Sequence, residues 1–251
     1  MATGTMVLRH ATTIWLALAA VLLGLVAWLW LELPHWRAGG TASTSVSSVT
    51  YLPHPLACPA KGSRIAIIGD SHVAGSQSGA GAAAFGAVLE SRLGRKITVS
   101  RYGIGGATAA DGESRWRGRD LPETDVVILA LGTNDAAPRG WLRDKTPAKL
   151  TDFSGSLNRQ IALWRARGHA VMLLAPPPGG SAAITARLEP YRQATRDLGR
   201  QLGIAVLDPA DAFAACRPAQ PMLSRDALHM NARGHQCLGT WLAHQFCPPN
   251  S

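Results

Sequence analysis

A serine, a histidine and an aspartate lie in segments of this sequence where they could carry out nucleophilic catalysis. Ser71 stands in a Gly-Asp-Ser-His segment directly after a short apolar stretch that is typical of a buried strand. A serine on a tight turn at the carboxyl end of such a strand is well placed to act as a nucleophile. Asp226 precedes His229 by three residues, a spacing that lets the carboxylate turn back and hold the imidazole in the tautomer of a general base.

Two further segments could stabilise the negative charge that such a nucleophile creates on a carbonyl oxygen. Residues 102–108 read Tyr-Gly-Ile-Gly-Gly-Ala-Thr, and backbone N–H groups in a glycine-rich turn can face a developing oxyanion. Asn134 follows the most apolar strand-like segment in a Gly-Thr-Asn-Asp turn, so that its amide could donate to the same point. Each segment alone is also ordinary turn chemistry, and only their combination is informative.

The elements that must position these residues follow one another in a regular alternation from about Cys58 to Cys247. Repeated βα units predict an α/β fold with a parallel sheet that is covered by helices on both faces. In such a sheet the carboxyl ends of the strands meet at one edge, which would bring the four segments together. The expected strands are 64–68, 96–102, 125–131, 170–175 and 204–207, and the expected helices are 82–93, a helix ending at about 167, 188–202 and 232–246.

These four segments, in this order and at strand ends, resemble the SGNH (GDSL-type) hydrolase family from about Arg64 to Phe246. The resemblance implies a flavodoxin-like three-layer α/β/α sandwich with a central parallel sheet. It also implies acyl transfer through a covalent intermediate, with Ser71 as nucleophile, His229 as base and Asp226 as its partner. No metal ion and no organic cofactor is expected for this chemistry.

The same resemblance assigns the oxyanion hole to the backbone N–H of Ser71, the backbone N–H of Gly106 and the side chain of Asn134. Gly105 is the alternative to Gly106, because the run of glycines leaves the register open. The sequence departs from the family at His72, where many members have leucine. His72 could line the mouth of the site, although a core or surface histidine is favoured.

The N-terminal region predicts a membrane anchor. Residues 11–31 carry no charge, and 21 helical residues at 1.5 Å each span the roughly 30 Å hydrocarbon core of a bilayer. The alternative is a cleavable signal peptide, whose apolar region is normally only about 7–15 residues long. We therefore expect an anchor or signal segment over 1–37, a flexible linker over 38–57 and the hydrolase domain over 58–251. Either reading places that domain outside the cytoplasm: on the periplasmic side of a bacterial membrane, or secreted if the segment is cleaved.

Composition restricts the partners of this chain. With 47% hydrophobic residues it is not a disordered protein. The formal net charge is +9, but the basic residues are mostly single arginines and no run of five like charges occurs. We therefore expect no nucleic-acid partner, whereas a diffusely positive surface suits anionic glycans or lipid headgroups.

Several substrates and one non-enzymatic role are compatible with these motifs. The favoured function is hydrolysis of small, acetyl-type esters on an envelope or extracellular polysaccharide. The alternatives are a lipid esterase or lysophospholipase held beside its substrate by the anchor, and an O-acyltransferase with the same triad. A catalytically inactive carbohydrate-binding module is the alternative from a different class, and the intact set of catalytic residues argues against it.

Four cysteines in an exported domain predict two disulfides. No Cys-x-x-Cys pair occurs, so a zinc site is not expected. In a parallel sheet Cys58 precedes the first strand and lies at the edge where strands begin, and the final helix is long enough to bring Cys247 back there. Cys216 and Cys237 both lie toward the opposite edge. Because a bridge needs Cα atoms within about 7 Å, the expected pairs are Cys58–Cys247 and Cys216–Cys237.

Overall fold

The computed structural model describes residues 50–79, 83–94, 97–121, 123–136, 146–216, 218 and 221–248 of the 251-residue chain. The expected membrane anchor and the larger part of the expected linker lie outside these residues. Within the part of the chain that is described, no helix is both long and apolar enough to cross a membrane.

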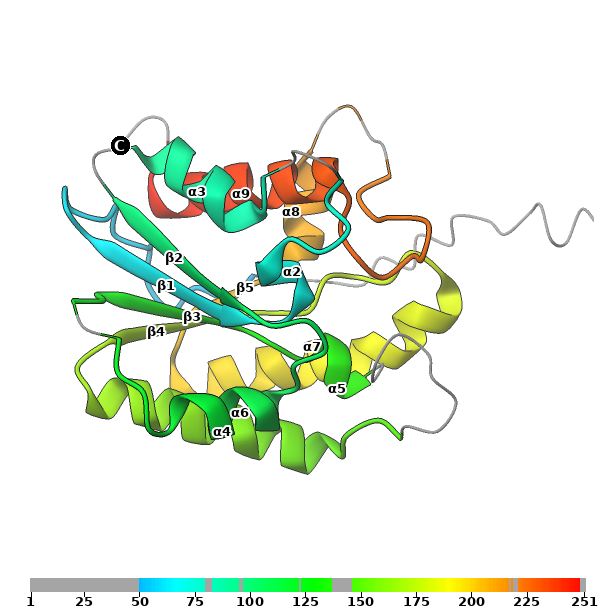
Figure 1. The fold of residues 1–251 in the computed structure, drawn as a ribbon, viewed down its shortest axis with the longest axis horizontal. Coiled ribbons are helices and arrows are strands. Elements are labelled where there is room, and N and C mark those ends of the chain that lie inside the picture. The colour runs from blue at the N-terminus through cyan, green and yellow to red at the C-terminus, as the bar shows by residue number, and fades with distance from the viewer. Residues whose placement is uncertain are drawn as a thin grey trace, which may run out of the picture. The chain divides into compact units, whose positions relative to one another are not determined.

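The fold is built on one parallel sheet of five strands in the order β2-β1-β3-β4-β5 (Figure 1). The register pairs Ile65 of β1 with Val99 of β2 and with Val126 of β3, so that β1 is bonded on both sides. Strands buried on both faces are continuously apolar, as the Val-Val-Ile-Leu-Ala sequence of β3 shows. The strands are β1 (Arg64–Gly69), β2 (Thr98–Gly103), β3 (Val126–Ala130), β4 (Ala170–Leu174) and β5 (Val206–Leu207).

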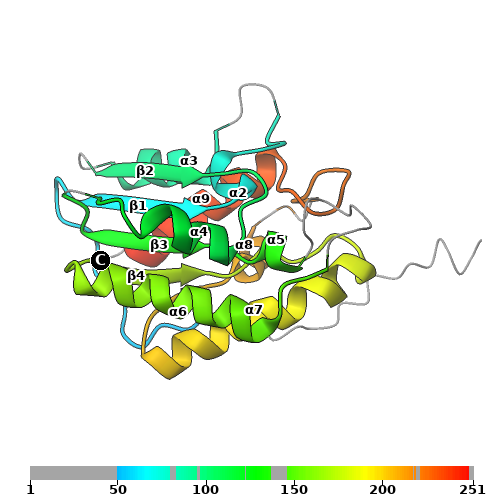
Figure 2. The same cartoon turned by 60° about the horizontal axis from the view of Figure 1, so that its bottom comes forward.

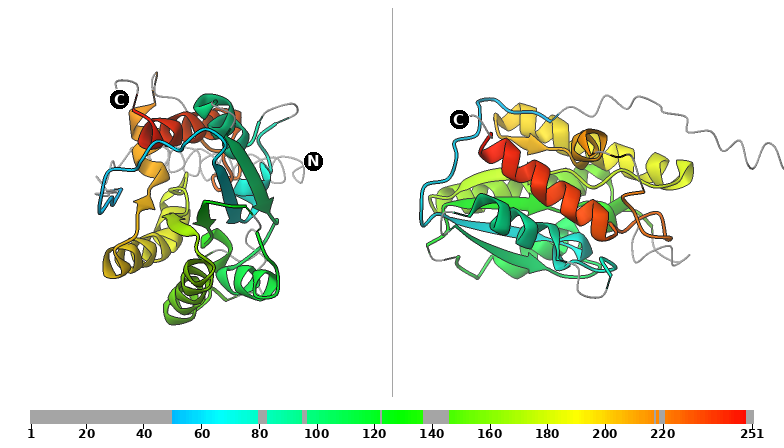
Figure 3. Two further views of the ribbon diagram at one scale, coloured as in Figure 1. Left: turned by 90° about the vertical axis from the view of Figure 1, so that its left-hand side faces the viewer. Right: turned by 90° about the horizontal axis from the view of Figure 1, so that it is seen from above.

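Helices cover both faces of this sheet, as expected for repeated βα units (Figures 2 and 3). One layer contains α3 (Phe85–Leu93), α8 (Pro209–Ala215) and α9 (Ala232–Phe246), and the other contains α4 (Ala109–Trp116), α6 (Leu150–Ala166) and α7 (Ala182–Leu202). Two short helices, α2 (Ser71–Ala74) and α5 (Thr133–Ala136), follow β1 and β3 directly. The expected three-layer α/β/α sandwich is confirmed.

The sheet separates two apolar cores. Phe85, Leu89 and Leu242 belong to the core between the sheet and α3 and α9, where each is fully buried. Phe153 and Trp164 belong to the second core, beneath α4, α6 and α7. Because both faces of the sheet are packed against a core, the carboxyl ends of its strands are held in fixed positions.

Four helices were not expected from the sequence, namely α2, α4, α5 and α8. The helices α2 and α5 have only four residues each, too few to show a helical period. The helix α4 is mostly polar and contains Gly112, so its apolar pattern is weak. In addition, α7 begins at Ala182 rather than near 188, because the side chain of Ser181 caps it by accepting from the Ile184 N–H at 3.3 Å.

The packed domain includes residues that precede Cys58, the expected domain boundary. Tyr51 forms an antiparallel bridge with Val206, with N–H···O distances of 2.9 and 2.8 Å in the two directions. The Thr50 N–H donates to Asp211 Oδ2 at 2.7 Å, and the Thr50 hydroxyl accepts from the Asp208 N–H at 3.1 Å. Residues 50 and 51 are thus bound along β5 rather than part of a free linker, because the outer edge of this strand offers unpaired backbone groups.

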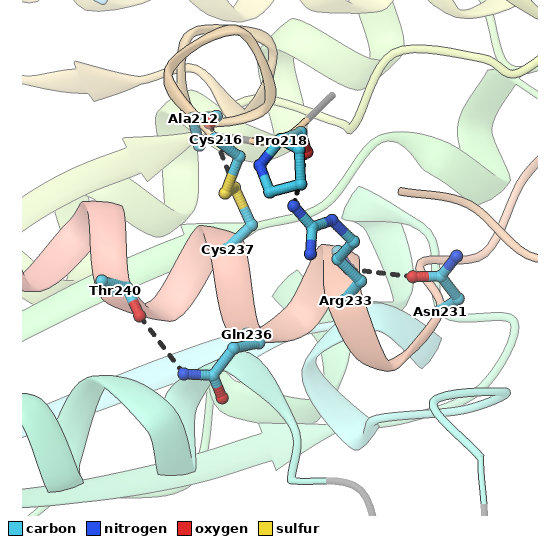
Figure 4. Close-up of a disulfide and its surroundings, with 9 residues drawn as sticks. Ala212, Cys216, Pro218, Asn231, Arg233, Gln236, Cys237 and Thr240 are labelled. Atoms are coloured by element: carbon cyan, nitrogen blue, oxygen red, sulfur yellow. Dashed lines mark hydrogen bonds between the residues drawn. A yellow bond between two sulfur atoms is a disulfide. The ribbon is translucent and has the colours of Figure 1, made fainter. Parts of the chain in front are cut away.

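Both disulfides join the pairs that the topology argument gave. Cys58 and Cys247 lie at the edge where the strands begin, with Cα atoms 4.7 Å apart. Cys216, which follows α8, is bonded to Cys237 in α9, with Cα atoms 6.1 Å apart (Figure 4). The second bridge ties α8 to the helix that follows the His229 segment.

Candidate active site

Ser71 is presented by the tight turn between β1 and α2. Asp70 is the N-cap of α2, and its Oδ1 accepts from the His72 N–H at 2.9 Å. Ser71 is the first residue of this helix, so its own N–H has no partner within the helix. The end of β2 passes very close to the turn, because a Cβ at Gly103 would lie 2.1 Å from the Ala74 nitrogen. Glycine at 103 is therefore required for this approach.

The structure brings Ser71 together with His229, which lies 158 residues later in the sequence, and with Asp226, which precedes His229 by three residues. Ser71 Oγ lies 3.0 Å from His229 Nε2, and His229 Nδ1 lies 2.6 Å from Asp226 Oδ2. These are the contacts that a general base and its orienting carboxylate require. The His229 and Asp226 side chains are 18% and 31% exposed, so the pair is reached from solvent at the surface of a cleft.

The turn that carries Asp226 and His229 is held by hydrogen bonds and contains a strained residue. Asp226 Oδ1 accepts from the Leu228 and His229 N–H groups, both at 3.0 Å. Ala227 has a φ of 56°, a left-handed conformation that costs a residue with a Cβ roughly 1–2 kcal/mol. The Ala227 carbonyl accepts from the Gly180 N–H at 2.8 Å, which fixes the turn to the segment after β4.

Asp226 is a carboxylate at neutral pH, because its pKa is lowered. Partial burial acts to raise its pKa, but hydrogen bonds from the Leu228 N–H, the His229 ring and the His229 N–H outweigh that effect, and the net pKa is below its usual value. An ionised Asp226 can stabilise an imidazolium on His229.

The residues expected to form the oxyanion hole, Ser71, Gly106 and Asn134, line the same cleft. Gly106 has a φ of 77°, in the left-handed region that favours glycine. Within the described residues, no acceptor is bonded to the N–H of Ser71 or of Gly106. Asn134 Nδ2 donates to the Ala107 carbonyl at 3.0 Å and lies 3.5 Å from Asp70 Oδ2, a distance at the limit of hydrogen bonding. One amide hydrogen thus orients Asn134, and the other is held only weakly.

A cleft of about 560 Å³ connects these groups. Its walls come from the turn after β1, the glycine-rich turn after β2, the first two turns of α4, and the ends of the Asn134 and His229 segments. The lining side chains are mostly small or polar, and Ile104 is the largest apolar one. The cleft is lined by Ser71, Ser76, Ile104, Gly105, Gly106, Ala107, Asp111, Arg115, Asn134 and His229.

Two buried carboxyl groups lie beneath the cleft and were not singled out from the sequence. Burial raises the pKa of Asp70 to about 6, against the hydrogen bond from the His72 N–H. Burial likewise raises the pKa of Asp135 to about 7, although both of its oxygens accept from the Ala109 N–H at 3.2 and 3.0 Å. The adjacency of Asp70 to Ser71 and of Asp135 to Asn134 was the available signal. These acids fix the turns that carry the site.

His72 is a core residue, as the favoured alternative held, and it does not line the cleft. It is 4% exposed, and neither ring nitrogen has a hydrogen-bond partner among the described residues. Burial lowers the pKa of His72 to about 3, so the ring is neutral in the folded protein. Its ring lies 5.4 Å from that of His229, measured between centroids, so the two imidazoles are neighbours.

A second hollow, of about 380 Å³, lies on the other side of the Asp226–His229 turn. It is lined by Phe213, Met222, Leu223, the segment after β4 and Ala227. In the described part of the chain, no group of three or more His, Cys, Asp or Glu side chains is placed to hold a metal ion.

Comparison with known proteins gives both a family and a set of similar folds. The model of the GDSL-like Lipase/Acylhydrolase family matches residues 67–237. No curated protein matches the chain. Among solved structures, LAE5, an alpha/beta hydrolase enzyme from the metagenome of Lake Arreo, Spain, is 25% identical, with a TM-score of 0.61 over 75% of this chain and 97% of that one.

Two further solved structures share the fold at lower identity. The lipase/acylhydrolase from Enterococcus faecalis is 22% identical, with a TM-score of 0.61 over 73% of this chain and 94% of its own. Axe2, an acetylxylan esterase from Geobacillus stearothermophilus, is 20% identical, with a TM-score of 0.59 over 75% and 95% of the two chains. The family model spans more than half of the sequence and includes the Ser71 turn, the glycine-rich turn, the Asn134 turn and His229. The chain therefore belongs to the GDSL-like lipase/acylhydrolase family, whose members are enzymes that act on ester bonds.

Proposed function

We propose that this hydrolase removes small, acetyl-type acyl groups from an envelope or extracellular polysaccharide. The observation that carries the chemistry is the pair of contacts at 3.0 and 2.6 Å that joins Ser71 to His229 and His229 to Asp226. In this proposal Ser71 is the nucleophile, His229 the general base and acid, and Asp226 the group that orients and stabilises the imidazolium.

The reaction proceeds in two acyl transfers. His229 Nε2 takes the proton of Ser71 Oγ while that oxygen attacks the ester carbonyl, and the tetrahedral oxyanion accepts from the N–H groups of Ser71 and Gly106 and from Asn134. The protonated His229 then gives its proton to the leaving alcohol, and the acyl group remains on Ser71. Water, activated in the same way by His229, releases the acid and restores the serine.

The shape of the cleft supports a short acyl group. Its side chains are mostly small or polar, and Ile104 and Ala107 are the only apolar ones beyond the glycines among the described lining residues. A long acyl chain gains its binding energy from burying methylene groups, at about 0.8 kcal/mol each, and this cleft offers little apolar surface for that. Axe2, which has the same fold at 20% identity, is an acetylxylan esterase. A lipid esterase has less support, and an acyltransferase would use the same catalytic residues.

The site of action that we propose is outside the cytoplasm. Two disulfides in one domain are typical of proteins that fold in an oxidising compartment. The apolar segment 11–31 would serve as a membrane anchor, or as a signal peptide if it is removed. Recovery of the mature protein in the membrane fraction, with the domain open to protease from the outer face of that membrane, would support the anchor. A soluble mature form that begins near residue 41 would support the signal peptide.

The chemistry is tested with p-nitrophenyl acetate, butyrate and octanoate and the variants S71A, H229A and D226N. We expect the acetate to be hydrolysed best, S71A and H229A to be inactive, and D226N to keep some activity because the oxyanion hole and substrate contacts survive. Near-normal turnover by folded S71A would overturn the mechanism. Preference for octanoate would favour a lipid esterase, and no turnover of any ester by the wild type would favour an obligate transferase or a binding module.

A further inference from the structure

The helix α4 presents two charged side chains to the cleft. Asp111 and Arg115 lie one turn apart on the same face of α4, and both line the cleft that contains Ser71 and His229. The opposite face of α4 is buried, with Gly112 against Leu131 and Gln160 and with Trp116 in the core. The helix is therefore fixed, and the backbone position of Arg115 at the cleft is fixed with it.

Arg115 differs from Arg117 and Arg159 because its charge is not neutralised by a carboxylate of the described residues. Glu113, on the buried side of α4, binds Arg117 at 2.6 Å and Arg159 at 2.8 Å. Asp111 is used at the start of the helix, where its Oδ2 accepts from the N–H and hydroxyl of Thr108 at 3.0 and 2.9 Å. Within the described residues, no hydrogen bond and no ion pair reaches the Arg115 guanidinium.

A guanidinium that is free to turn in a substrate cleft has one obvious class of ligand. Its planar fork matches the two oxygens of a carboxylate or of a phosphate, and such charge-assisted contacts are among the strongest in proteins. The other ionisable group of the cleft wall besides Asp111 is His229, which is already bonded to Asp226. The formal net charge of +9 also attracts polyanions toward the molecule.

We infer that Arg115 binds a carboxylate of the substrate and that the preferred substrate is an acyl ester of an acidic, uronate-containing glycan. This inference rests on the proposed esterase function and adds the charge of the substrate to it. A carboxylate on a glycan is favoured over the phosphate of a lipid because the residues that line the cleft are mostly glycines and polar side chains, with Ile104 and Ala107 as the apolar side chains among them, which suits a sugar better than an acyl chain.

The test compares one polymer in two charge states. Acetylated polygalacturonate and the same polymer with its carboxylates converted to methyl esters are given to the wild type, R115Q, R115K and the control R92Q, and acetate release is measured. Arg92 is an exposed residue of α3 that does not line the cleft, so R92Q makes the same change in net charge elsewhere. The quantity compared is the ratio of kcat/KM on the acidic polymer to kcat/KM on the neutral one.

We expect a ratio of about 10 or more for the wild type and for R92Q, as one charge-assisted contact allows. R115Q should bring the ratio close to one, mainly by raising KM for the acidic polymer. R115K should recover part of it, because lysine keeps the charge but not the fork. Added salt should raise KM for the acidic polymer in the wild type and much less in R115Q.

Four results would overturn the inference. A wild-type ratio near one, or an R115Q ratio equal to that of the wild type, would show that Arg115 does not recognise the carboxylate. An effect of R115Q confined to hydrolysis of a lysophospholipid would assign Arg115 to a lipid headgroup instead. Failure of the wild type to hydrolyse even p-nitrophenyl acetate would instead remove the proposed esterase itself, and the inference with it.

Discussion

At the scale of single residues, Asn134 is the proposed oxyanion donor whose contribution is simplest to measure. Its amide is oriented by the Ala107 carbonyl at 3.0 Å, so that replacement by alanine removes a fixed donor without filling the cleft. We expect N134A to lower kcat by about 10²–10³-fold with a smaller change in KM, because the bond forms fully only in the transition state. Steady-state kinetics on p-nitrophenyl acetate measure both parameters.

The matched control for N134A is S76A. Ser76 also lines the cleft, but its N–H is bonded to the Ser71 carbonyl at 2.9 Å and its side chain has no assigned part in the chemistry. A decrease in kcat for S76A as large as that for N134A would mean that any substitution in the cleft lowers activity. A decrease in kcat below about threefold for N134A would show that the oxyanion hole does not need the Asn134 amide.

His72 predicts a pH dependence of stability. The pKa of its ring is lowered by burial to about 3 in the folded protein, whereas an unfolded histidine titrates near 6.5. The stability that comes from keeping the ring neutral is therefore fully present above about pH 6.5 and is lost as the pH falls toward 3. The loss amounts to at most about 1.4 kcal/mol per pH unit for one group.

We expect H72L to lose less stability on acidification than the wild type does, because leucine has no proton to bind. Urea unfolding at pH 7.5, 6.0 and 5.0 measures the difference between the two proteins, in which the contributions of Asp70, Asp135 and His235 largely cancel. H54L, at an exposed position, is the control and should follow the wild type. Parallel pH profiles for H72L and the wild type would contradict the prediction.

At the scale of elements, a buried ion-pair network joins α7 to the turn between β5 and α8. Asp208 is fully buried and binds Arg192 at 2.7 Å and Arg196 at 3.0 Å, while it also caps α8 by accepting from the Ala210 N–H at 2.9 Å. Removing this buried carboxylate leaves the two buried arginines with Glu189 as their one remaining carboxylate partner among the described residues. We expect D208A to lower the free energy of unfolding by about 3–5 kcal/mol.

The control for D208A is a pair of the same chemistry on the surface of the same helix. Asp197 binds Arg200 at 2.6 Å, but the two side chains are 59% and 45% exposed. We expect D197A to cost about 0–1 kcal/mol, because water screens the pair. Denaturant unfolding of both variants tests the contrast, and equal costs would show that burial of the Asp208 network has no energetic weight.

The sequence predicted the strands and the long helices because these elements have clear apolar periods. The first and third strands were placed to within two residues, since β3 and the part of β1 after Arg64 are continuous apolar segments. The helix α4 was missed because its exposed face is charged and its buried face contains Gly112 in place of a large apolar residue. With it the sequence reading missed Arg115, whose place in the cleft depends on the path of that helix.

The sequence identified those residues of the candidate site that belong to short motifs. Ser71 and Asn134 each follow a strand, and parallel strands bring their carboxyl ends to one edge. The Asp226–His229 turn comes after α8, and its three-residue spacing identified it. The buried acids Asp70 and Asp135 were not identified from the sequence, because their raised pKa values result from burial in the folded protein. Burial depends on the packing of distant elements, which no local pattern encodes.

At the scale of the whole molecule, the two disulfides close loops of very different length. The bond between Cys58 and Cys247 spans 189 residues, and that between Cys216 and Cys237 spans 21. In the chain-entropy description, a longer closed loop restricts the unfolded chain more. Replacing Cys58 and Cys247 by alanine should therefore lower the free energy of unfolding by about 5 kcal/mol. Replacing Cys216 and Cys237 should lower it by about 3 kcal/mol.

Denaturant unfolding of the two double variants measures this order. Both should keep the triad geometry at neutral pH, so activity on p-nitrophenyl acetate checks that the folded states are comparable. A larger cost for C216A/C237A would contradict the entropic order, and would mean that bracing α8 against α9 stabilises the folded state more than loop closure restricts the unfolded one.

The path of the chain at Thr50 determines how this enzyme can be fixed to a support. Because Tyr51 runs antiparallel to Val206 and Thr50 is bonded to Asp208 and Asp211, the described chain enters the domain at the carboxyl end of the sheet, the same edge as the cleft. Cys247, just after α9, is bonded to Cys58, which precedes the start of β1 at the opposite edge. Immobilisation through a tag after residue 248 therefore directs the cleft away from a solid surface and toward a large polymeric substrate, whereas a short attachment just before residue 50 directs the cleft toward that surface.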